Sequence, residues 1–242
     1  MIHTETSISD TVNQIMASPA PILFPDTCAL VDLIRVPYRT KKSKEAGYIL
    51  KAASYLVSSS QNIVPNLWVV ILPGIYKEWR EHSQNTKKEL TEHWSKLDAT
   101  IEIAHASANA VNIALPSAII YSDLGIENIL LGLSEKFLSN AIFISTDSDC
   151  VNRAYLRLLN KEAPSQKGGE MKDCTIIEHC LELCKQLRNV GFTKNCVFNT
   201  SNTKDFCRPR SSELQVPLNV QFDAVNLTLT TKWQWAKAVL NV

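Results

Sequence analysis

The sequence predicts an α/β fold, a three-layer α/β/α sandwich with a mostly parallel central sheet. Short apolar runs of strand length recur along the chain, and segments with apolar residues at helical spacing lie between them. Strands that alternate with helices build parallel sheets that are covered by helices on both faces. The chain has 242 residues, of which 45% are hydrophobic and 20% are charged. These values are ordinary for one globular domain with a substantial core.

The first predicted strand covers residues 21–26. Its apolar run ends at a single acid, Asp26, and the flanking prolines favour a short buried strand over a helix. Residues 27–35 are mostly apolar and predict one or two helical turns that end near Pro37. Residues 1–20 are polar with little periodicity, and predict an arm or a short first helix.

A second pair of elements follows. Residues 45–60 predict a helix, and residues 67–72 predict a buried strand. A proline after that strand favours a helix start, and this helix is expected to continue to about Ala106 with its charges on a solvated face. The basic run at residues 39–45 is either a solvated loop or helix start, or an edge that contacts phosphates.

The second half of the chain continues the alternation. Residues 117–139 predict one or two helices. The later elements are expected in this order: a strand at 141–145, a helix from the capping residues 146–149 to Asn160, a turn-rich loop at 161–172, a strong helix from Asp173, a strand at 196–199, a polar loop at 207–215, and a strand and short helix within 216–242. We therefore expect an N-terminal arm, residues 1–20, and a single domain, residues 21–242, with a helical insertion at about 107–140.

The charge and the apolar content argue against several classes of protein. The formal net charge is +1, so the chain has no global basic field, and binding to nucleic acid would need a local basic patch. No apolar run reaches the length of a membrane span, so we expect no membrane partner. The N-terminus has neither the basic region nor the apolar region of a signal peptide.

The cysteines predict a reducing, cytoplasmic environment. There are seven, an odd number, and none forms a CxxC pair. Cys174, Cys180 and Cys184 lie close to His179 in the sequence, which leaves a zinc site as an alternative. Because their spacing matches no recognised zinc finger, the main expectation is that they are buried and pack as small hydrophobic side chains.

Four acidic residues follow predicted strands or begin predicted helices. They are Asp26, Glu78, Asp173 and Asp205. The carboxyl ends of parallel strands share one edge of a sheet, where open α/β sheets bind ligands, so these side chains are expected to converge. Clustered carboxylates repel one another unless a cation is present, and their oxygens suit Mg²⁺ or Mn²⁺. The alternative is a set of local roles, with the three aspartates as helix or turn caps and Glu78 as a surface acid.

Four motifs in the chain resemble those of the PIN-domain family of metal-dependent nucleases. They are FPDTCAL, LPGIYKEW, KGGEMKDCTIIEHCLEL and FNTSNTKDF, and the resemblance covers most of residues 21–206. The last motif contains the pattern Thr-x-Asn-x-x-Asp-Phe that is typical of the family. The resemblance implies a catalytic, metal-binding quartet, formed by Asp26, Glu78, Asp173 and Asp205. It also implies that Thr200 and Asn202 orient Asp205 or bind a phosphate oxygen.

The chain departs from the compact toxin-type PIN domain, because about a hundred residues separate Glu78 from Asp173. It is similar to larger PIN-like proteins in which a segment like RAYLRLLNKEAPSQKGGEMKDC precedes the third acid. This similarity places Arg153, Lys167 and Lys172 on the substrate side, where they are expected to contact phosphates. A solvated loop is the alternative for this stretch.

The resemblance implies metal-dependent hydrolysis of phosphodiester bonds, with Mg²⁺ or Mn²⁺ as the cofactor. The expected enzyme is an endoribonuclease that cuts single-stranded RNA and leaves a 5′-phosphate. The alternative is a non-catalytic PIN-fold module that binds nucleic acid or a protein. A homodimer and an inhibitor or partner protein stay open, as do roles as a toxin, in phage defence or in RNA processing.

Overall fold

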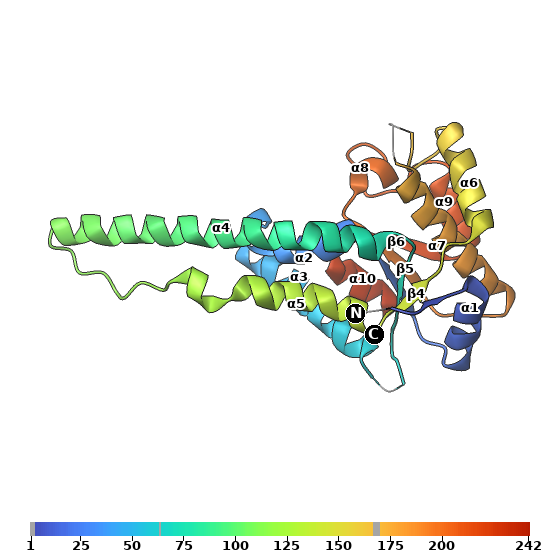
Figure 1. Ribbon diagram of the computed structural model, residues 1–242, viewed down its shortest axis with the longest axis horizontal. Helices are drawn as coiled ribbons and strands as arrows, with labels where there is room; N and C mark the ends of the chain where they lie inside the picture. The colour runs from blue at the N-terminus through green and yellow to red at the C-terminus, as the bar shows by residue number, and fades with distance from the viewer. Residues whose placement is uncertain (1–2, 63, 167–169) are drawn as a thin grey trace.

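The computed structural model describes residues 3–62, 64–166 and 170–242 of the chain. Within this part, six strands form one sheet in the order β1-β4-β3-β2-β5-β6, and every pairing between them is parallel. The strands are β1 (Glu5–Thr6), β2 (Ile22–Pro25), β3 (Trp68–Ile71), β4 (Ile142–Ile144), β5 (Cys196–Asn199) and β6 (Leu227–Thr230). Helices cover both faces of the sheet (Figure 1), which confirms the predicted three-layer α/β/α sandwich.

The helices form two layers that pack against opposite faces of the sheet (Figure 1). One layer contains α2 (Thr27–Arg39), α3 (Ser43–Ser60), α4 (Ile75–Ala110), α5 (Ile126–Ser139) and α10 (Trp233–Leu240). The other contains α1 (Ile8–Ala17), α6 (Ser148–Leu159), α7 (Met171–Asn189) and α9 (Leu218–Ala224). Two short helices, η1 (Tyr121–Leu124) and α8 (Thr203–Phe206), lie in the connections.

The centre of the sheet is mainly apolar. Ile22, Leu23 and Phe24 in β2 have no exposed surface, and neither have Val197 and Phe198 in the neighbouring β5. Strands that are buried on both faces have continuous apolar sequences, which explains why these two runs were recognisable without a structure. Backbone pairing continues just past the strand ends, because Asp26 N donates to Asn199 O at 2.9 Å.

Two predictions for the first forty residues need correction. The N-terminal arm does contain a helix, α1, but it also adds β1 to the edge of the sheet, where Glu5 pairs with Phe143. Pro37 does not end α2, which continues to Arg39. Near the end of a helix a proline removes few hydrogen bonds. The last turn is closed by Thr40 N, which donates to Val36 O at 3.1 Å.

The start of α7 also differs from the prediction. The helix begins at Met171 and its N-cap residue is Glu170, so Asp173 is neither the first residue of the helix nor its cap. The predicted local role of Asp173 as an N-cap is therefore wrong. Asp173 instead lies in the first helical turn, where the helix dipole favours a negative charge.

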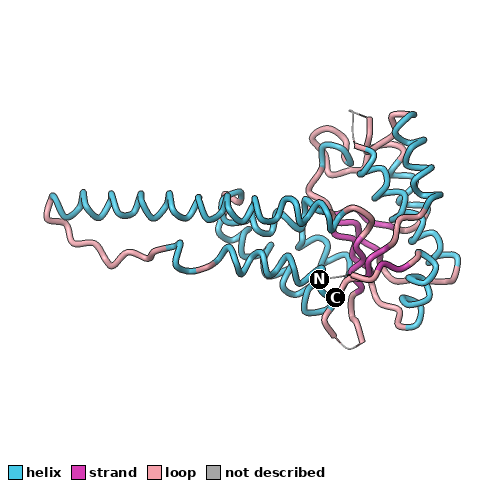
Figure 2. The backbone as a smooth tube through the Cα atoms, viewed as in Figure 1, coloured by secondary structure: helices cyan, strands magenta, loops and turns pink. Residues whose placement is uncertain are grey.

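A long projection extends from the body of the molecule (Figures 1 and 2). It consists of the distal part of α4 and an extended return at residues 111–120. The last buried residue of α4 is Trp94, and its indole stacks on Tyr121 in η1 with 5.6 Å between ring centroids. The carboxylate of Asp98 accepts hydrogen bonds from the backbone N–H groups of Tyr121 and Ser122, at 2.7 and 2.9 Å.

The helix that follows the projection belongs to the packed core. Ser134 in α5 accepts a hydrogen bond from Trp79 Nε1 at 2.8 Å and donates to Leu30 O at 3.0 Å, which ties α4, α5 and α2 together. Phe137 in α5 is fully buried. No helix in the described residues is both long enough and apolar enough to span a membrane.

Candidate metal centre

The strand order creates a crevice between β2 and β5. The chain passes from β2 to β3 and then to β4 in one direction, and later adds β5 on the opposite side of β2. Such a reversal separates the connections that leave the two neighbouring strands, and ligands of open α/β sheets bind there, outside the carboxyl ends of the strands. Asp26 directly follows β2, and Thr200 directly follows β5.

A cavity of about 310 Å³ opens at this edge of the sheet. The four predicted acids, Asp26, Glu78, Asp173 and Asp205, all line it, although they come from four different parts of the chain. The other lining residues are Thr27, Cys28, Glu170, Lys172, Asn202 and Lys204. The structure therefore brings together the residues that the sequence suggested would converge.

Asp26 is the most buried of the four acids, with 7% of its surface exposed. It is the N-cap residue of α2, and its Oδ1 accepts a hydrogen bond from Thr27 N at 2.8 Å. Its Oδ2 accepts bonds from Thr200 Oγ1 at 2.6 Å and from Cys28 Sγ at 2.9 Å. Burial raises the pKa of Asp26, and these hydrogen bonds oppose the rise. Asp26 is thus both the N-cap residue of α2 and a lining residue of the cavity.

Asp173 is half-buried, and its pKa is raised to about 7. Burial is the largest cause, and the neighbouring charge of Asp26 is the next. Asp205 and Glu78 raise the pKa of Asp173 further, while Lys172 lowers it. The cavity therefore holds more negative charge than its own cations offset, which is the condition under which a bound cation is stabilising.

Lys172 is one of two lysines that line the cavity. Its Nζ donates a hydrogen bond to Glu78 Oε1 at 2.5 Å and lies 3.6 Å from Glu170 Oε2. Burial lowers the pKa of the Lys172 ammonium, but the hydrogen bond and charge of Glu78, with other nearby acids, raise it overall. Lys172 was predicted to meet phosphates; in this structure it lies at the cavity and already pairs with an acid.

Asn202 orients Asp205, as expected, because its Nδ2 donates to Asp205 Oδ2 at 2.9 Å. Thr200 has a different partner from the one expected. Its hydroxyl donates to Asp26, as described above, and accepts a bond from Asn202 N at 3.0 Å. These two residues link the acid that follows β2 with the acid in α8. Asp205 is not a simple turn cap either, since Asn202 precedes α8 as its N-cap residue.

One residue predicted to bind substrate, Arg153, does not line the cavity. Arg153 in α6 forms ion pairs with Glu178 and Glu182, each at 3.0 Å, and lines a separate cavity beside α7. Lys167 lies outside the described residues. Four lining residues were missed, although all lie inside the motifs that were singled out: Thr27, Cys28, Glu170 and Lys204.

The donor groups fit Mg²⁺ or Mn²⁺ in kind, because the cavity offers carboxylate, hydroxyl and amide oxygens. Burial raises the pKa of Asp173 most, and the charges of the neighbouring acids, which such a cation would offset, raise it further. Among the described residues, no group of three or more His, Cys, Asp or Glu side chains has the arrangement needed to hold a metal ion. Closer approach of the carboxylates would therefore have to accompany binding.

The alternative zinc site gains no support from the structure. All seven cysteines are free, and Cys174, Cys180 and Cys184 are fully buried in the body of the protein. Both ring nitrogens of His179 are already used, since Nε2 accepts a bond from Asp147 N at 2.8 Å and Nδ1 lies 2.7 Å from Thr175 O. These thiols pack as small hydrophobic side chains.

Comparison with known proteins finds no match to a family model, to a curated protein or to a solved structure. The resemblance to the PIN domain therefore rests on the sequence motifs alone.

Proposed function

We propose that this chain is a metal-dependent endoribonuclease that hydrolyses phosphodiester bonds in single-stranded RNA. The observation that carries the proposal is the convergence of four acids from separate elements on one open cavity. This cavity lies at the reversal of strand order, and one of its acids, Asp173, has a pKa raised to about 7. The resemblance of the four motifs to PIN-domain nucleases supports the choice of reaction.

Each residue has a role in the proposed site. Asp26, Asp173 and Asp205 would hold Mg²⁺ or Mn²⁺, and Glu78 would complete the site or position the attacking water. A bound ion lowers the pKa of its water and offsets the charge that develops on the phosphate. Thr200 and Asn202 hold two of the carboxylates in place. Lys172 and Lys204 also line the cavity; Lys172 pairs with Glu78 and would have to exchange this partner for a phosphate.

A cleavage assay tests the proposal directly. Purified protein is incubated with labelled single-stranded RNA or DNA in Mn²⁺, Mg²⁺ or EDTA. We expect metal-dependent cleavage of the RNA that is lost in Asp26→Asn and in Asp173→Asn. These substitutions keep the size of the side chain but remove a charge that the metal needs.

Asp123→Asn is the matched control, because Asp123 is exposed in η1 and lies outside the cavity. It should cleave like wild type. Retained cleavage in both acid variants would contradict the proposed site, and metal-dependent cleavage of DNA alone would contradict the proposed substrate.

A second candidate function is a PIN-fold module that binds nucleic acid or a protein without cutting. The ion pair between Lys172 and Glu78 favours it, because one carboxylate is already neutralised by the protein itself. Calorimetry with Mn²⁺ separates the two functions. A nuclease is expected to bind Mn²⁺ and to lose most of this affinity in Asp173→Asn. For a binding module, the heat measured on adding Mn²⁺ should be the same for wild type and Asp173→Asn.

A further inference from the structure

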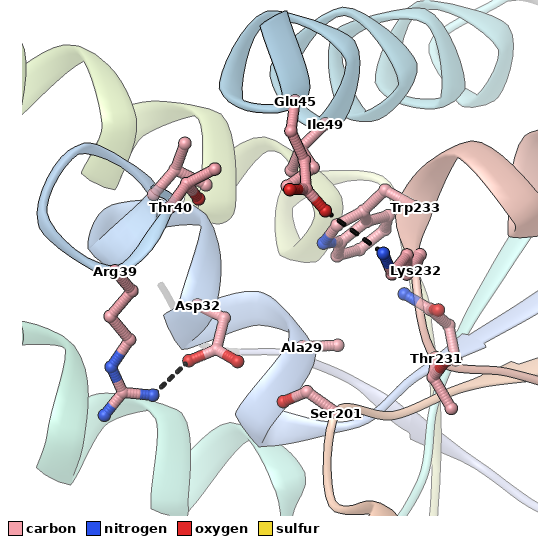
Figure 3. A pocket seen from close by; sticks show the side chains of 12 residues that line it. Ala29, Asp32, Arg39, Thr40, Glu45, Ile49, Ser201, Thr231, Lys232 and Trp233 are labelled. Carbon is pink, nitrogen blue, oxygen red and sulfur yellow. Dashed lines mark hydrogen bonds and ion pairs between the residues drawn. The ribbon is translucent and has the colours of Figure 1, made fainter. Parts of the chain in front are cut away.

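A second cavity lies beside the candidate metal centre (Figure 3). Its volume is about 200 Å³, and it is enclosed by α2, by the start of α3 and by the ends of β5 and β6. Adjacent residues of the chain line the two cavities. Ala29 and Ser201 line the second cavity, and their chain neighbours Cys28 and Asn202 line the first. Ser201 N also donates to Cys28 Sγ at 3.2 Å, so these segments form a shared wall.

The charges at the rim of the second cavity are paired within the protein. Arg39 bonds to Asp32 at 3.1 Å, and Lys232 bonds to Glu45 at 3.1 Å. Figure 3 shows these two pairs on opposite sides of the cavity. Because each charge has a partner of opposite sign, the cavity does not favour a charged ligand. A neutral group fits it better than a phosphate or an amine.

Apolar side chains form much of the wall, together with the hydroxyl side chains of Thr40, Ser201 and Thr231 and one amide. Ala29, Val36 and Trp233 are nearly fully buried and form part of the wall. A cavity of about 150 Å³ is enough to admit a single six-membered ring. The second cavity is therefore of a size for one flat heterocycle, which would also contact the indole of Trp233.

The amide belongs to Asn199, the last residue of β5, which is 1% exposed. Its Oδ1 accepts a hydrogen bond from Thr230 Oγ1 at 3.0 Å, and this bond fixes the orientation of the amide. Its Nδ2 is buried and has no hydrogen-bond partner among the described residues. A buried donor without a partner costs free energy, so the amide is matched to a ligand that brings an acceptor.

We propose that this cavity binds one pyrimidine base of a single-stranded RNA, with Asn199 Nδ2 donating to a carbonyl oxygen of the base. The inference rests on the proposed function, because that function places a phosphodiester at the neighbouring acids. Uracil and cytosine share the O2 carbonyl and consist of one six-membered ring. Adenine has no carbonyl oxygen and is larger. The backbone of Asn199 also contacts Asp26, so the base and the cleavage site are held by the same residue.

Binding is measured without cleavage, by fluorescence anisotropy in EDTA, with labelled oligo(U), oligo(C) and oligo(A) of equal length. We expect wild type to bind both pyrimidine oligomers more tightly than oligo(A). Asn199→Ala should lose about threefold to tenfold of this preference, the usual effect of one hydrogen bond between uncharged groups. Ile49→Trp fills the cavity and should weaken pyrimidine binding. Ile103→Trp is the matched control on the exposed end of α4 and should bind like wild type.

Thermal unfolding shows whether each variant is folded, and Thr40→Trp, also in the lining, replaces Ile49→Trp if that variant is not. Equal affinity of wild type for the three oligomers overturns the inference, and so does a pyrimidine preference that survives in Asn199→Ala. Metal-dependent cleavage that shows no base preference would overturn the inference while the proposed function stands. A pyrimidine preference that requires Asn199, in a protein that neither cuts RNA nor binds Mn²⁺, would leave the base site standing and overturn the nuclease.

Discussion

Asp173 shows how a single side chain responds to the crowding of acids around one cavity. Burial and the charge of Asp26 raise its pKa to about 7, although an isolated aspartate has a value of 3.8. At neutral pH without metal, the proton is therefore only partly lost from this carboxyl. A metal ion would compete with that proton for the same oxygens.

This shift predicts a pH dependence of stability in EDTA. Between the ordinary value of 3.8 and about 7, the folded protein holds a proton on Asp173 that the unfolded protein has released. The free energy of unfolding therefore falls as the pH rises through this window. We expect Asp173→Asn to show a smaller fall, because its amide does not titrate. Part of the fall should remain, because burial raises the pKa of Asp26 as well.

Urea unfolding at several pH values measures this slope. Asp123→Asn is expected to keep the slope of wild type, since Asp123 is exposed and lies outside the cavity. An Asp173→Asn variant whose stability falls with pH as steeply as that of wild type would show that this carboxyl is not the titrating group.

Thr200 predicts a second effect at the scale of one residue. Thr200→Val removes the hydroxyl that donates to Asp26, and both groups are buried. We expect a loss of about 1–3 kcal/mol in the free energy of unfolding, as for other buried carboxylates that lose a donor. Mn²⁺ affinity should fall too, because Asp26 is then held less firmly and keeps its proton to a higher pH.

Urea unfolding and calorimetry give the two values. The same substitution at Thr228, which is exposed on β6, serves as the control and should change both values little. Equal effects at the two positions would mean that the bond to Asp26 has no special role.

The sequence identifies the acids of the site better than it identifies their partners. Asp26 and Asp205 are recognisable because each follows a run of strand residues. The bond between Thr200 and Asp26 joins residues 174 positions apart, so no local pattern indicates it. Arg153 was assigned to the substrate for the same reason. Its partners Glu178 and Glu182 lie one helix later and become neighbours only when α6 packs on α7.

At the scale of elements, α6 and α7 are joined by a buried ion pair. The guanidinium of Arg157 bonds to Glu178 through Nε at 2.9 Å, and it also donates to Ala163 O at 2.7 Å and to Gln221 Oε1 at 3.0 Å. Arg157 is 3% exposed and Glu178 is 7% exposed. All three nitrogens of the Arg157 guanidinium have partners. Removal of Arg157 leaves the buried Oε1 of Glu178 without its partner, and only Oε2 still pairs, with the more exposed Arg153 at 3.0 Å.

Arg157→Met is therefore expected to lower the free energy of unfolding by about 3–5 kcal/mol. The double variant Arg157→Met with Glu178→Leu should lose less than the sum of the two single variants, because it leaves no buried charge alone. Urea unfolding of wild type, the two single variants and the double variant gives the coupling free energy between Arg157 and Glu178. Arg208→Met breaks the exposed pair with Glu213 and should cost less than about 1 kcal/mol. Additive losses in the Arg157–Glu178 cycle would contradict the coupling.

Elements with a continuous apolar run or a clear helical period were predictable, and the shortest element was not. The short strands β2, β3, β4 and β5 each lie in an apolar run, and α4 is long enough to show its helical period. The two residues of β1 show none, and their place is decided by pairing with β4. The start of α7 was misplaced because Glu170 and Met171 follow a glycine-rich stretch that favours a loop in sequence terms.

At the scale of the whole molecule, the projection is separate from the packed body. Beyond Trp94, the rest of α4 and the extended return at residues 111–120 contain no buried residue. We expect replacement of residues 100–119 by a short Gly–Ser turn to leave the melting temperature close to that of wild type, because Asp98 and Tyr121 already lie side by side. Differential scanning calorimetry measures it.

Asp98→Ala in the full chain is the companion variant. It should loosen η1 and speed protease cleavage of the return, with little change in the melting temperature. A large drop in melting temperature on replacing the tip would show that the projection stabilises the body.

The alternation of strands and helices gave the fold class, but it did not give the order of the strands. The order of the strands depends on pairing between segments that are far apart in the sequence. This order brings the four acids to one edge of the sheet. The cavity beside the acids was not predictable for a similar reason. Asn199, Trp233 and Ala29 are distant in sequence, and each has an ordinary local role in a strand or a helix.

The position of β5 has a consequence for synthesis of the protein. β2 is made near the start of the chain, but its neighbour β5 begins only at Cys196 and must emerge from the ribosome before it can insert beside β2. Until then β2 is an open edge, and Asp205 is absent from the centre. The proposed active site is therefore incomplete while most of the chain is being translated, because two of its elements, β5 and α8, are made late.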